Sequence, residues 1–319
     1  MKKIILFAFP LFLTGCYQDF DPKIDTEPVL CLNSLITAGE PIYVNVSHTW
    51  VYTDMAGSKD HSVDDAELQI FANDILVDSE YIAQEGDHIH IIASSQKYGE
   101  AEAEVTVPFA TQISAVDFTP KVTDVELTQT PGWGINASIE FDAYINLRIS
   151  DDEKTDDYYR LIDKSFDQNQ IVSFSPGSFE PLDPVFYEQT NTFDDVMNGT
   201  YYSMCFSDRL FNRETNTINF AFSPCYIHLS GLKEDQADLE CGWEFTLYSI
   251  SESYYNWLAF CDQAGGIVFG DFGDYGLAEP IWGYSNVSTG AGVVAAQSSA
   301  TITLNLQDFL SDYISKEYN

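Results

Sequence analysis

The residue with the clearest chemical role in the sequence is Cys16, the first of six cysteines. Two lysines open the chain, an apolar run follows over residues 4–13, and Leu13-Thr14-Gly15-Cys16 ends it. The run is too short to span a membrane, which takes about 20 residues as helix. It is typical of a secretory signal that ends in a bacterial lipobox, where the thiol accepts a diacylglycerol group. Acyl chains such as palmitate would anchor Cys16, each buried CH₂ contributing about 0.8 kcal/mol. A plain secretory signal with an incidental cysteine is the alternative.

Two histidines, His88 and His90, lie two positions apart in a stretch that alternates polar and apolar residues. Such residues share one face of a strand and could offer two imidazoles to a metal ion, with Glu85 and Asp87 nearby. Zinc usually takes four ligands, and the sequence pattern does not direct a further ligand towards this pair. A solvent-facing strand surface explains both histidines more simply, so we expect neither a metal nor a cofactor.

Acidic residues dominate the charge of the chain: 50 Asp and Glu against 14 Lys and Arg give a formal net charge of −36. Such a chain repels nucleic-acid phosphates, which excludes nucleic acid as a partner. Two carboxylates could hydrolyse a glycosidic bond, but among so many acids no pair stands out. The acidic segments 151–157 and 271–274 could bind calcium, yet neither has EF-hand spacing, and solvated loops are the simpler interpretation.

Motifs of known enzymes are weak or missing. Asp271-Phe272-Gly273 matches a kinase triplet, but the glycine-rich phosphate loop and the His-Arg-Asp element are not found. The sequence also has no Gly-x-Ser-x-Gly nucleophile elbow. We therefore expect a protein that binds rather than catalyses.

Five cysteines follow Cys16, and the expected compartment is oxidising, so disulfides are permitted. An odd number leaves at least one thiol free or paired between chains, and Cys31, in an apolar stretch, is the expected free one. The other four allow three pairings, between which the sequence does not choose: Cys205, Cys225, Cys241 and Cys261. No pair has Cys-x-x-Cys spacing, so a zinc site of that kind is not expected.

The elements that must position these residues are mostly strands. Polar and apolar residues alternate in several short runs before residue 108, and Asn73-Asp74 marks a turn between two of them. This spacing predicts an immunoglobulin-like β-sandwich over residues 29–108. We expect a signal peptide over 1–15 and a flexible tether over 16–28 before it.

Residues 109–319 are predicted to form a second, larger β-rich domain with one short helix, so that the fold class is all-β. Alternation with polar residues indicates that one face of a strand is buried, and its members are Ile135, Ala137, Ile139 and Phe141. The helix is predicted to start with Ser249 as cap and Glu252 three residues later. Gly265-Gly266 is predicted to end it.

Aromatic residues near glycines are the remaining binding candidates. Trp133 lies between two glycines, and the glycine-rich region 265–296 contains further aromatic residues. Such side chains stack on sugars or anchor a partner protein when exposed, whereas core filling is the alternative. The predicted partner surface consists of Tyr275, Trp282 and Tyr284.

Several motifs occur in an order that resembles a known family. They are the lipobox, Leu32-Asn33-Ser34-Leu35-Ile36 before Gly39-Glu40-Pro41, Asp157-Tyr158-Tyr159-Arg160-Leu161, Phe206-Ser207-Asp208, Tyr254-Tyr255, Glu279-Pro280-Ile281, Ser285-Asn286-Val287 and a glycine pair. Together they resemble the Bacteroidota lipoprotein family called domain of unknown function 4249, over nearly all of the chain after Cys16. Family members often read Gly-Leu-Gly and then phenylalanine at the glycine pair, so Gly290-Ala291-Gly292-Val293 departs from the pattern.

The resemblance implies an outer-membrane lipoprotein with two β domains, encoded near TonB-dependent transporters and without established catalytic residues. Acids soon after Cys16, at Asp19 and Asp21, look like the export signal of surface lipoproteins. We expect a lipid-anchored accessory protein facing the cell exterior, with the periplasmic face as the alternative location. It would assist a TonB-dependent transporter in nutrient uptake. An extracellular glycan-active hydrolase that uses paired carboxylates is the alternative function.

Overall fold

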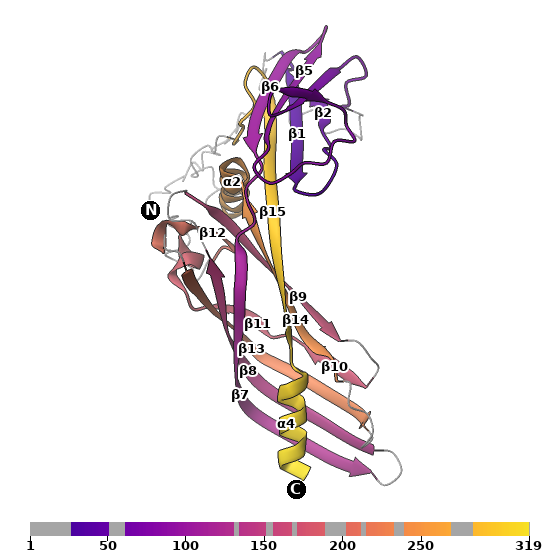
Figure 1. Cartoon of the computed structure of the whole chain (residues 1–319), viewed down its shortest axis with the longest axis vertical. Coiled ribbons are helices and arrows are strands. Elements are labelled where there is room, and N and C mark those ends of the chain that lie inside the picture. The colour runs from indigo at the N-terminus through magenta and orange to yellow at the C-terminus, as the bar shows by residue number, and fades with distance from the viewer. Residues whose placement is uncertain are drawn as a thin grey trace, which may run out of the picture.

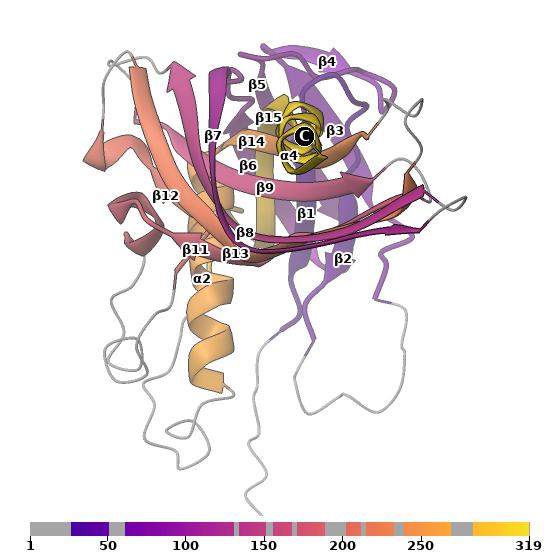
Figure 2. The same cartoon turned by 90° about the horizontal axis from the view of Figure 1, so that it is seen from below.

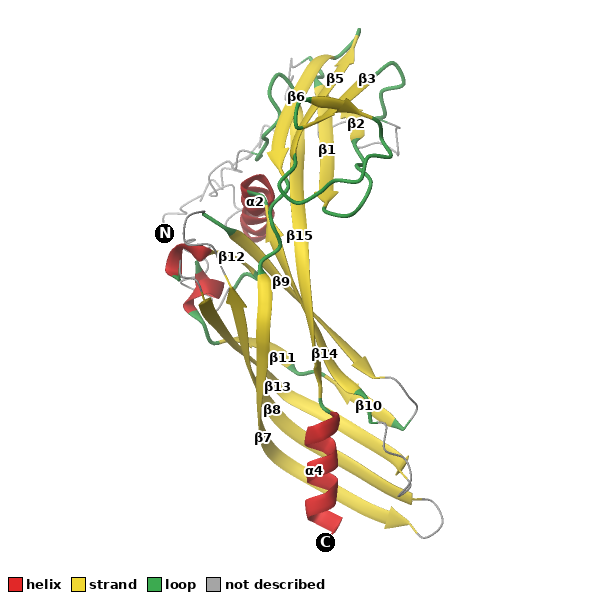
Figure 3. Cartoon of the chain, in the orientation of Figure 1, coloured by secondary structure: helices red, strands yellow, loops and turns green. Residues whose placement is uncertain are grey.

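The computed structural model describes residues 27–50, 61–130, 134–150, 156–167, 171–188, 202–211, 215–232, 239–268 and 283–318. The described chain is elongated and consists mainly of strands, as Figures 1 and 3 show. These strands form sheets of six, five and four members, which confirms the predicted all-β class. In the described part of the chain, no helix is both long and apolar enough to cross a membrane.

A four-stranded antiparallel sheet forms one layer of the N-terminal sandwich, in the order β4-β3-β5-β6. Asn73 and Asp74 both have positive φ angles, of 51° and 65°, as a tight two-residue hairpin requires, and the predicted turn is thereby confirmed. The strands are β3 (Glu67–Ala72), β4 (Ile75–Val77), β5 (His88–Ser95) and β6 (Gly99–Thr106).

The facing layer of this sandwich contains a strand from the far end of the chain. It consists of β1 (Leu30–Thr37), β2 (Asn45–His48) and the first half of β15 (Ala291–Asn305). Strands β1 and β15 pair in parallel, and Val294 and Ala296 share the core with Leu30 and Leu32. The N-terminal sandwich thus includes a strand from beyond the predicted boundary at 108. The sequence did not predict this strand, because a pairing between segments so distant in sequence leaves no local pattern.

A second sandwich has two larger sheets. One sheet contains β7 (Gln112–Thr130), β8 (Gly134–Ser150), β10 (Val172–Ser175), β11 (Ser178–Pro181) and β13 (Thr215–Leu232). The other contains β9 (Tyr158–Asp167), β12 (Cys205–Ser207), β14 (Cys241–Ile250) and the second half of β15. Short 3₁₀ helices are η2 (Pro184–Tyr187) and η3 (Asp208–Leu210).

Aromatic rings fill the space between these two sheets. Trp243 and Phe245 on β14 contact Phe220 and Phe222 on β13, with ring centroids 5.2 Å apart for Trp243–Phe222 and 5.4 Å for Phe245–Phe220. The predicted buried face of β8 is confirmed, since Ile135, Ala137, Ile139 and Phe141 are all 6% exposed or less. These rings join the two sheets into one core.

Two α-helices, α2 and α4, lie in the described part of the chain. Helix α2 (Glu252–Val268) corresponds to the predicted helix, while α4 (Gln307–Tyr318) was not predicted. Figure 2 shows α4 lying between the two sheets of the second sandwich, seen from below. Its Leu310 is fully buried, and the ring of Phe309 lies 5.2 Å from that of Phe141. Helix α4 therefore fills the open end of this core.

Candidate functional site

Most of the predicted site residues fall outside the described part of the chain. Cys16, Trp133, Tyr275 and Trp282 lie there, as do segment 271–274 and most of 151–157. Tyr284 is described and half-buried, with Asn256 and Glu252 of α2 as neighbours. Burial raises the pKa of its hydroxyl above the ordinary value. One member of the predicted partner surface is thus placed, and it lies beside α2.

A groove of about 420 Å³ lies where α2 meets the sheet that joins the two sandwiches. Figure 1 shows α2 beside β15 at this level. Apolar and aromatic side chains make up most of the lining, and the full set is Asn33, Ser34, Leu35, Tyr43, Tyr254, Trp257, Val293 and Ala295. Its volume is in the range of sites that hold small organic ligands, about 300–1,000 Å³.

The floor of the groove is the outer face of β1 and β15. On β1 the even-numbered residues turn towards the sandwich core, so Asn33 and Leu35 face outward. The parallel register sets Asn33 beside Val293 and Leu35 beside Ala295, and Asn33 Oδ1 accepts a hydrogen bond of 3.3 Å from Val293 N. Leu35 is 43% exposed, so apolar surface is open to solvent here.

Helix α2 forms the wall of the groove because its first turn is tied to β15. Ser251 Oγ accepts hydrogen bonds from Tyr254 N and Ala296 N, and Ser253 Oγ donates to Val294 O at 2.9 Å. The predicted cap, Ser249, instead lies within β14 and accepts from Thr111 N. The strand continues one residue past Ser249, to Ile250, and the next serine, Ser251, takes the capping role.

Tyr254 and Trp257 present their rings to the groove from this wall, with centroids 6.0 Å apart. Tyr254 Oη accepts a hydrogen bond of 3.0 Å from Arg160 Nη1 on β9. On the same strand, the ring of Tyr158 lies 4.7 Å from that of Tyr255. Contacts with β9 therefore hold the aromatic wall in place.

The motifs around Arg160 and Ser207 lie on paired strands. Strand β12 runs antiparallel to β9 and sets Cys205 opposite Arg160 and Ser207 opposite Tyr158. Ser207 donates twice to Glu188, from N at 2.7 Å and from Oγ at 2.6 Å. This polar network supports the end of β9 that holds α2.

The segment before β15 is fixed to that strand by Asn286. Its Oδ1 accepts from Val294 N at 2.9 Å, and its Nδ2 donates to Val294 O at 2.8 Å, as a neighbouring strand would. Ser285 Oγ accepts from Val287 N and shapes the turn. Ser285-Asn286-Val287 thus has a structural role next to the groove.

The comparison with family models gives one match. The family described as "Domain of unknown function (DUF4249)" matches residues 17–303. The chain belongs to this family. We found no match among curated proteins and none among solved structures. The motifs that carried the resemblance now have a common location, since those at Leu32–Ile36, 157–161, 206–208, Tyr254-Tyr255 and 285–287 surround α2 and its groove.

Sequence reasoning did not select the groove residues Asn33, Leu35 and Trp257 as a site. One signal was present: Leu30, Leu32 and Ile36 predict one buried face for β1, which leaves Leu35 as an apolar residue on the opposite face. Trp257 gave no such signal, because an aromatic residue on a short amphipathic helix is most often part of a core.

His88 and His90 do share the outer face of β5, but their neighbours differ from those considered in the sequence. Glu102 and Glu104 on β6 approach them. Asp87 is buried and accepts hydrogen bonds from Asn73, Tyr81 and Gln84 within the sandwich.

The five cysteines in the described part of the chain are free thiols, so none of the three possible pairings among the later four is formed. They lie on β1, β12, β13, β14 and α2. Burial raises the pKa of Cys205 and Cys241 to about 12 and that of Cys225 to about 11. These three thiols are packing residues rather than nucleophiles.

Proposed function

We propose that this chain is a lipid-anchored, non-catalytic binding protein of the outer membrane, attached through Cys16 and facing the cell exterior. The lipobox and the short apolar leader support the anchor. The family match begins at residue 17, directly after Cys16, as expected if the mature chain starts at that cysteine. Acyl chains at one end would leave the elongated β body free to reach a partner.

The observation that carries the binding role is the groove beside α2. Leu35 and Tyr43, exposed by 43% and 74%, keep apolar surface in water at a site lined by further aromatic rings. Covering apolar surface contributes about 25 cal/mol per Å². A preformed groove held by hydrogen bonds at α2 loses little conformational entropy when a ligand enters.

The proposed partner is a TonB-dependent transporter, which the chain would assist in nutrient uptake. An apolar segment of the transporter would occupy the groove, with Trp257 and Tyr254 as anchors, since aromatic residues in such pockets dominate binding energy. The many acidic residues would keep the rest of the surface solvated.

Co-purification from outer membranes tests this role. Leu35→Glu places a charge in the groove and should reduce recovery of the transporter by about tenfold or more, since a buried unpaired charge costs several kcal/mol. Leu68→Glu is a matched control, because Leu68 is 39% exposed and lies on β3, outside the groove. Equal recovery with both variants would argue against the groove as the docking site.

A second measurement separates binding from catalysis. The purified protein should release no sugars from outer-surface polysaccharides. Release that disappears on changing one specific carboxylate would replace the binding role with that of a glycan hydrolase.

A further inference from the structure

Four side chains with metal-binding atoms share the outer face of the N-terminal sandwich, on strands that do not line the groove. His88 and His90 alternate along β5, and Glu102 and Glu104 alternate along β6. The register sets His90 directly opposite Glu104. The residues that alternate with them along the two strands are buried, namely Ile89, Ile91, Ala103 and Val105. Period-two alternation therefore directs all four side chains to the same side.

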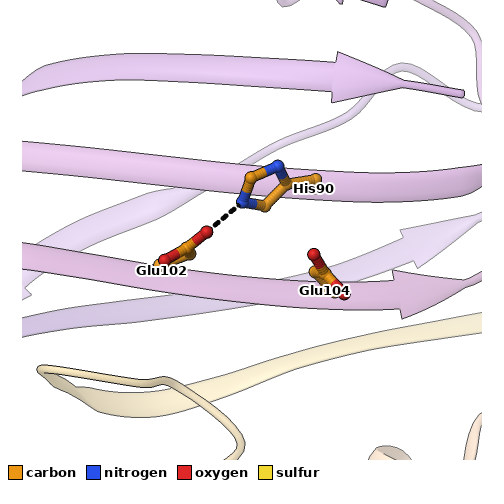
Figure 4. A group of neighbouring side chains, drawn as sticks. All are labelled: His90, Glu102 and Glu104. Atoms are coloured by element: carbon orange, nitrogen blue, oxygen red, sulfur yellow. Dashed lines mark hydrogen bonds and ion pairs between the residues drawn. The ribbon is translucent and has the colours of Figure 1, made fainter. Parts of the chain in front are cut away.

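Their distances are close to those of a metal site. His90 Nε2 lies 2.6 Å from Glu102 Oε1, and Figure 4 shows Glu104 beside this pair on the same strand as Glu102. One ligand atom each from His90, Glu102 and Glu104 lie within 4.8 Å of one another. Tetrahedral zinc with bonds of about 2.0–2.1 Å needs ligand atoms about 3.3 Å apart, so shifts of about 1 Å would suffice.

A fourth ligand is in reach. His88 Nε2 lies 3.6 Å from Glu104 Oε2, close to the separation of two ligands on one ion. The side chains of His88 and Glu104 are 46% and 59% exposed, so they can turn towards an ion without disturbing the core. Two imidazoles and two carboxylates would then complete four-coordination.

The charge of this patch also favours a cation. Two glutamates are close together here, and the ion-pair partners shown for them among the described residues are the two histidines. A divalent ion would neutralise both carboxylates. The formal charge of −36 on the whole chain increases the local concentration of cations.

The backbone under the patch is held in place. Glu102 N donates to Ser288 O at 3.1 Å, and Ser288 N donates to Glu102 O at 2.7 Å, so β6 is bound on the side away from β5. The ring of Phe71 stacks on His90, with centroids 5.7 Å apart. Ligands on a rigid hairpin lose little freedom when they bind an ion.

We propose that His88, His90, Glu102 and Glu104 bind one divalent transition-metal ion, with zinc as the best match. Imidazole and carboxylate are both ligands that zinc accepts, and four of them satisfy its usual coordination number. The sequence offered Glu85 and Asp87 as acidic neighbours of the histidine pair, whereas in the structure the acidic neighbours are Glu102 and Glu104 of β6. This site is independent of the groove and of the proposed partner, so either proposal can fail alone.

Titration calorimetry of the purified protein with Zn²⁺ tests the site. Excess Mg²⁺ in the buffer occupies non-specific carboxylates. Wild type should bind one Zn²⁺ per chain through this site, and His90→Ala should weaken that binding by about tenfold or more. His228→Ala is the matched control, since His228 is an exposed strand histidine on β13 in the second sandwich, and it should bind as wild type does.

Co²⁺ provides a readout of the ligands themselves. Tetrahedral Co²⁺ absorbs strongly in the visible range, so wild type should become coloured, and Glu104→Gln should reduce the absorption. Glu104 is exposed, so its substitution should leave the fold intact. If circular dichroism shows that His90→Ala does not fold, Glu104→Gln tests the site in its place. Equal Zn²⁺ affinity in wild type and the folded site variants would overturn the proposal, as would displacement of Zn²⁺ by Mg²⁺.

Discussion

Gly292 is the residue that allows β15 to lie against β1. Its φ angle is +110°, and a Cβ atom added there would lie 2.1 Å from Leu32 O. Both the backbone angle and the close approach require a residue that has no side chain. The second glycine of Gly290-Ala291-Gly292 is thereby explained by strand pairing, and the groove floor depends on the same pairing through Val293.

Gly292→Ala should therefore destabilise the protein by about 2–5 kcal/mol, from backbone strain and overpacking together. Gly99→Ala is the control, because its φ angle is +83° but no atom beyond its two chain neighbours lies within 4 Å of the added Cβ. Strain alone should cost about 1–2 kcal/mol there. Urea denaturation compares the two, and an equal loss would contradict the role of the close approach.

Asp87 makes the stability of the N-terminal sandwich depend on pH. Burial alone would raise the pKa of its carboxyl, but hydrogen bonds from Gln84 N, Tyr81 Oη and Asn73 Nδ2, each 2.8 Å, lower it below the ordinary value. A carboxyl with a lowered folded-state pKa stabilises the fold above its unfolded pKa of about 3.9, and that contribution is lost as pH falls through the folded value.

Asp87→Asn should lower the free energy of unfolding at neutral pH by about 1.5–3 kcal/mol, the range for hydrogen bonds to a charged group. The difference from wild type should shrink below about pH 4, where the wild-type carboxyl also becomes protonated. Glu85→Gln, at an exposed position two residues earlier, serves as the control. A difference that stays constant from neutral to acid pH would show that the charge of Asp87 does not contribute.

At the scale of the elements, local sequence patterns were enough to predict strands but not to predict which strands pair with each other. The alternation from Ile135 to Phe141 and the turn at Asn73-Asp74 depend on neighbours in sequence, and both were predicted correctly. The pairing of β1 with β15 joins the two ends of the chain and leaves no trace in either segment alone. Because the groove is built on this pairing, its place could not be read from the sequence.

Helix α4 was missed for a related reason. Leu310 within the helix and Leu306 directly before it are buried, but the polar and aromatic residues between them give a weak helical pattern in a short segment. Its position is decided by tertiary contacts, chiefly those of Phe309 with Phe118 and Phe141. Short helices in proteins are stabilised mainly by such packing.

Leu310→Ala should reduce the free energy of unfolding by about 2–5 kcal/mol, since the side chain is fully buried and a cavity would remain. Ser311→Ala, at the next and exposed position, should have an effect within about 0.5 kcal/mol. Thermal unfolding followed by circular dichroism measures both. Similar midpoints for the two variants would mean that α4 is not part of the second core.

At the scale of the whole molecule, β15 connects the two sandwiches, because its first half pairs with β1 and its second half with β14. Figure 1 shows this strand along the length of the body. The groove lies beside the first half of the strand, at Val293 and Ala295, where α2 is also attached. A ligand in the groove would thus contact the continuous element that both cores share.

The proposed attachment of the whole molecule to the membrane depends on the sulfur atom of Cys16. Two or three acyl chains on Cys16 would bind the membrane stably, at about 0.8 kcal/mol per buried CH₂.

Cys16→Ser removes the thiol that carries the lipid and should release the protein from the membrane fraction or leave it as an unprocessed, slower-migrating precursor. Cys31→Ser is the control, because that thiol lies half-buried on β1, and the variant should fractionate as wild type does. Fractionation and gel mobility after carbonate washing measure the outcome. If Cys16→Ser stayed membrane-bound at the wild-type mobility, the attachment would have to come from the protein surface, and the acyl anchor would be wrong.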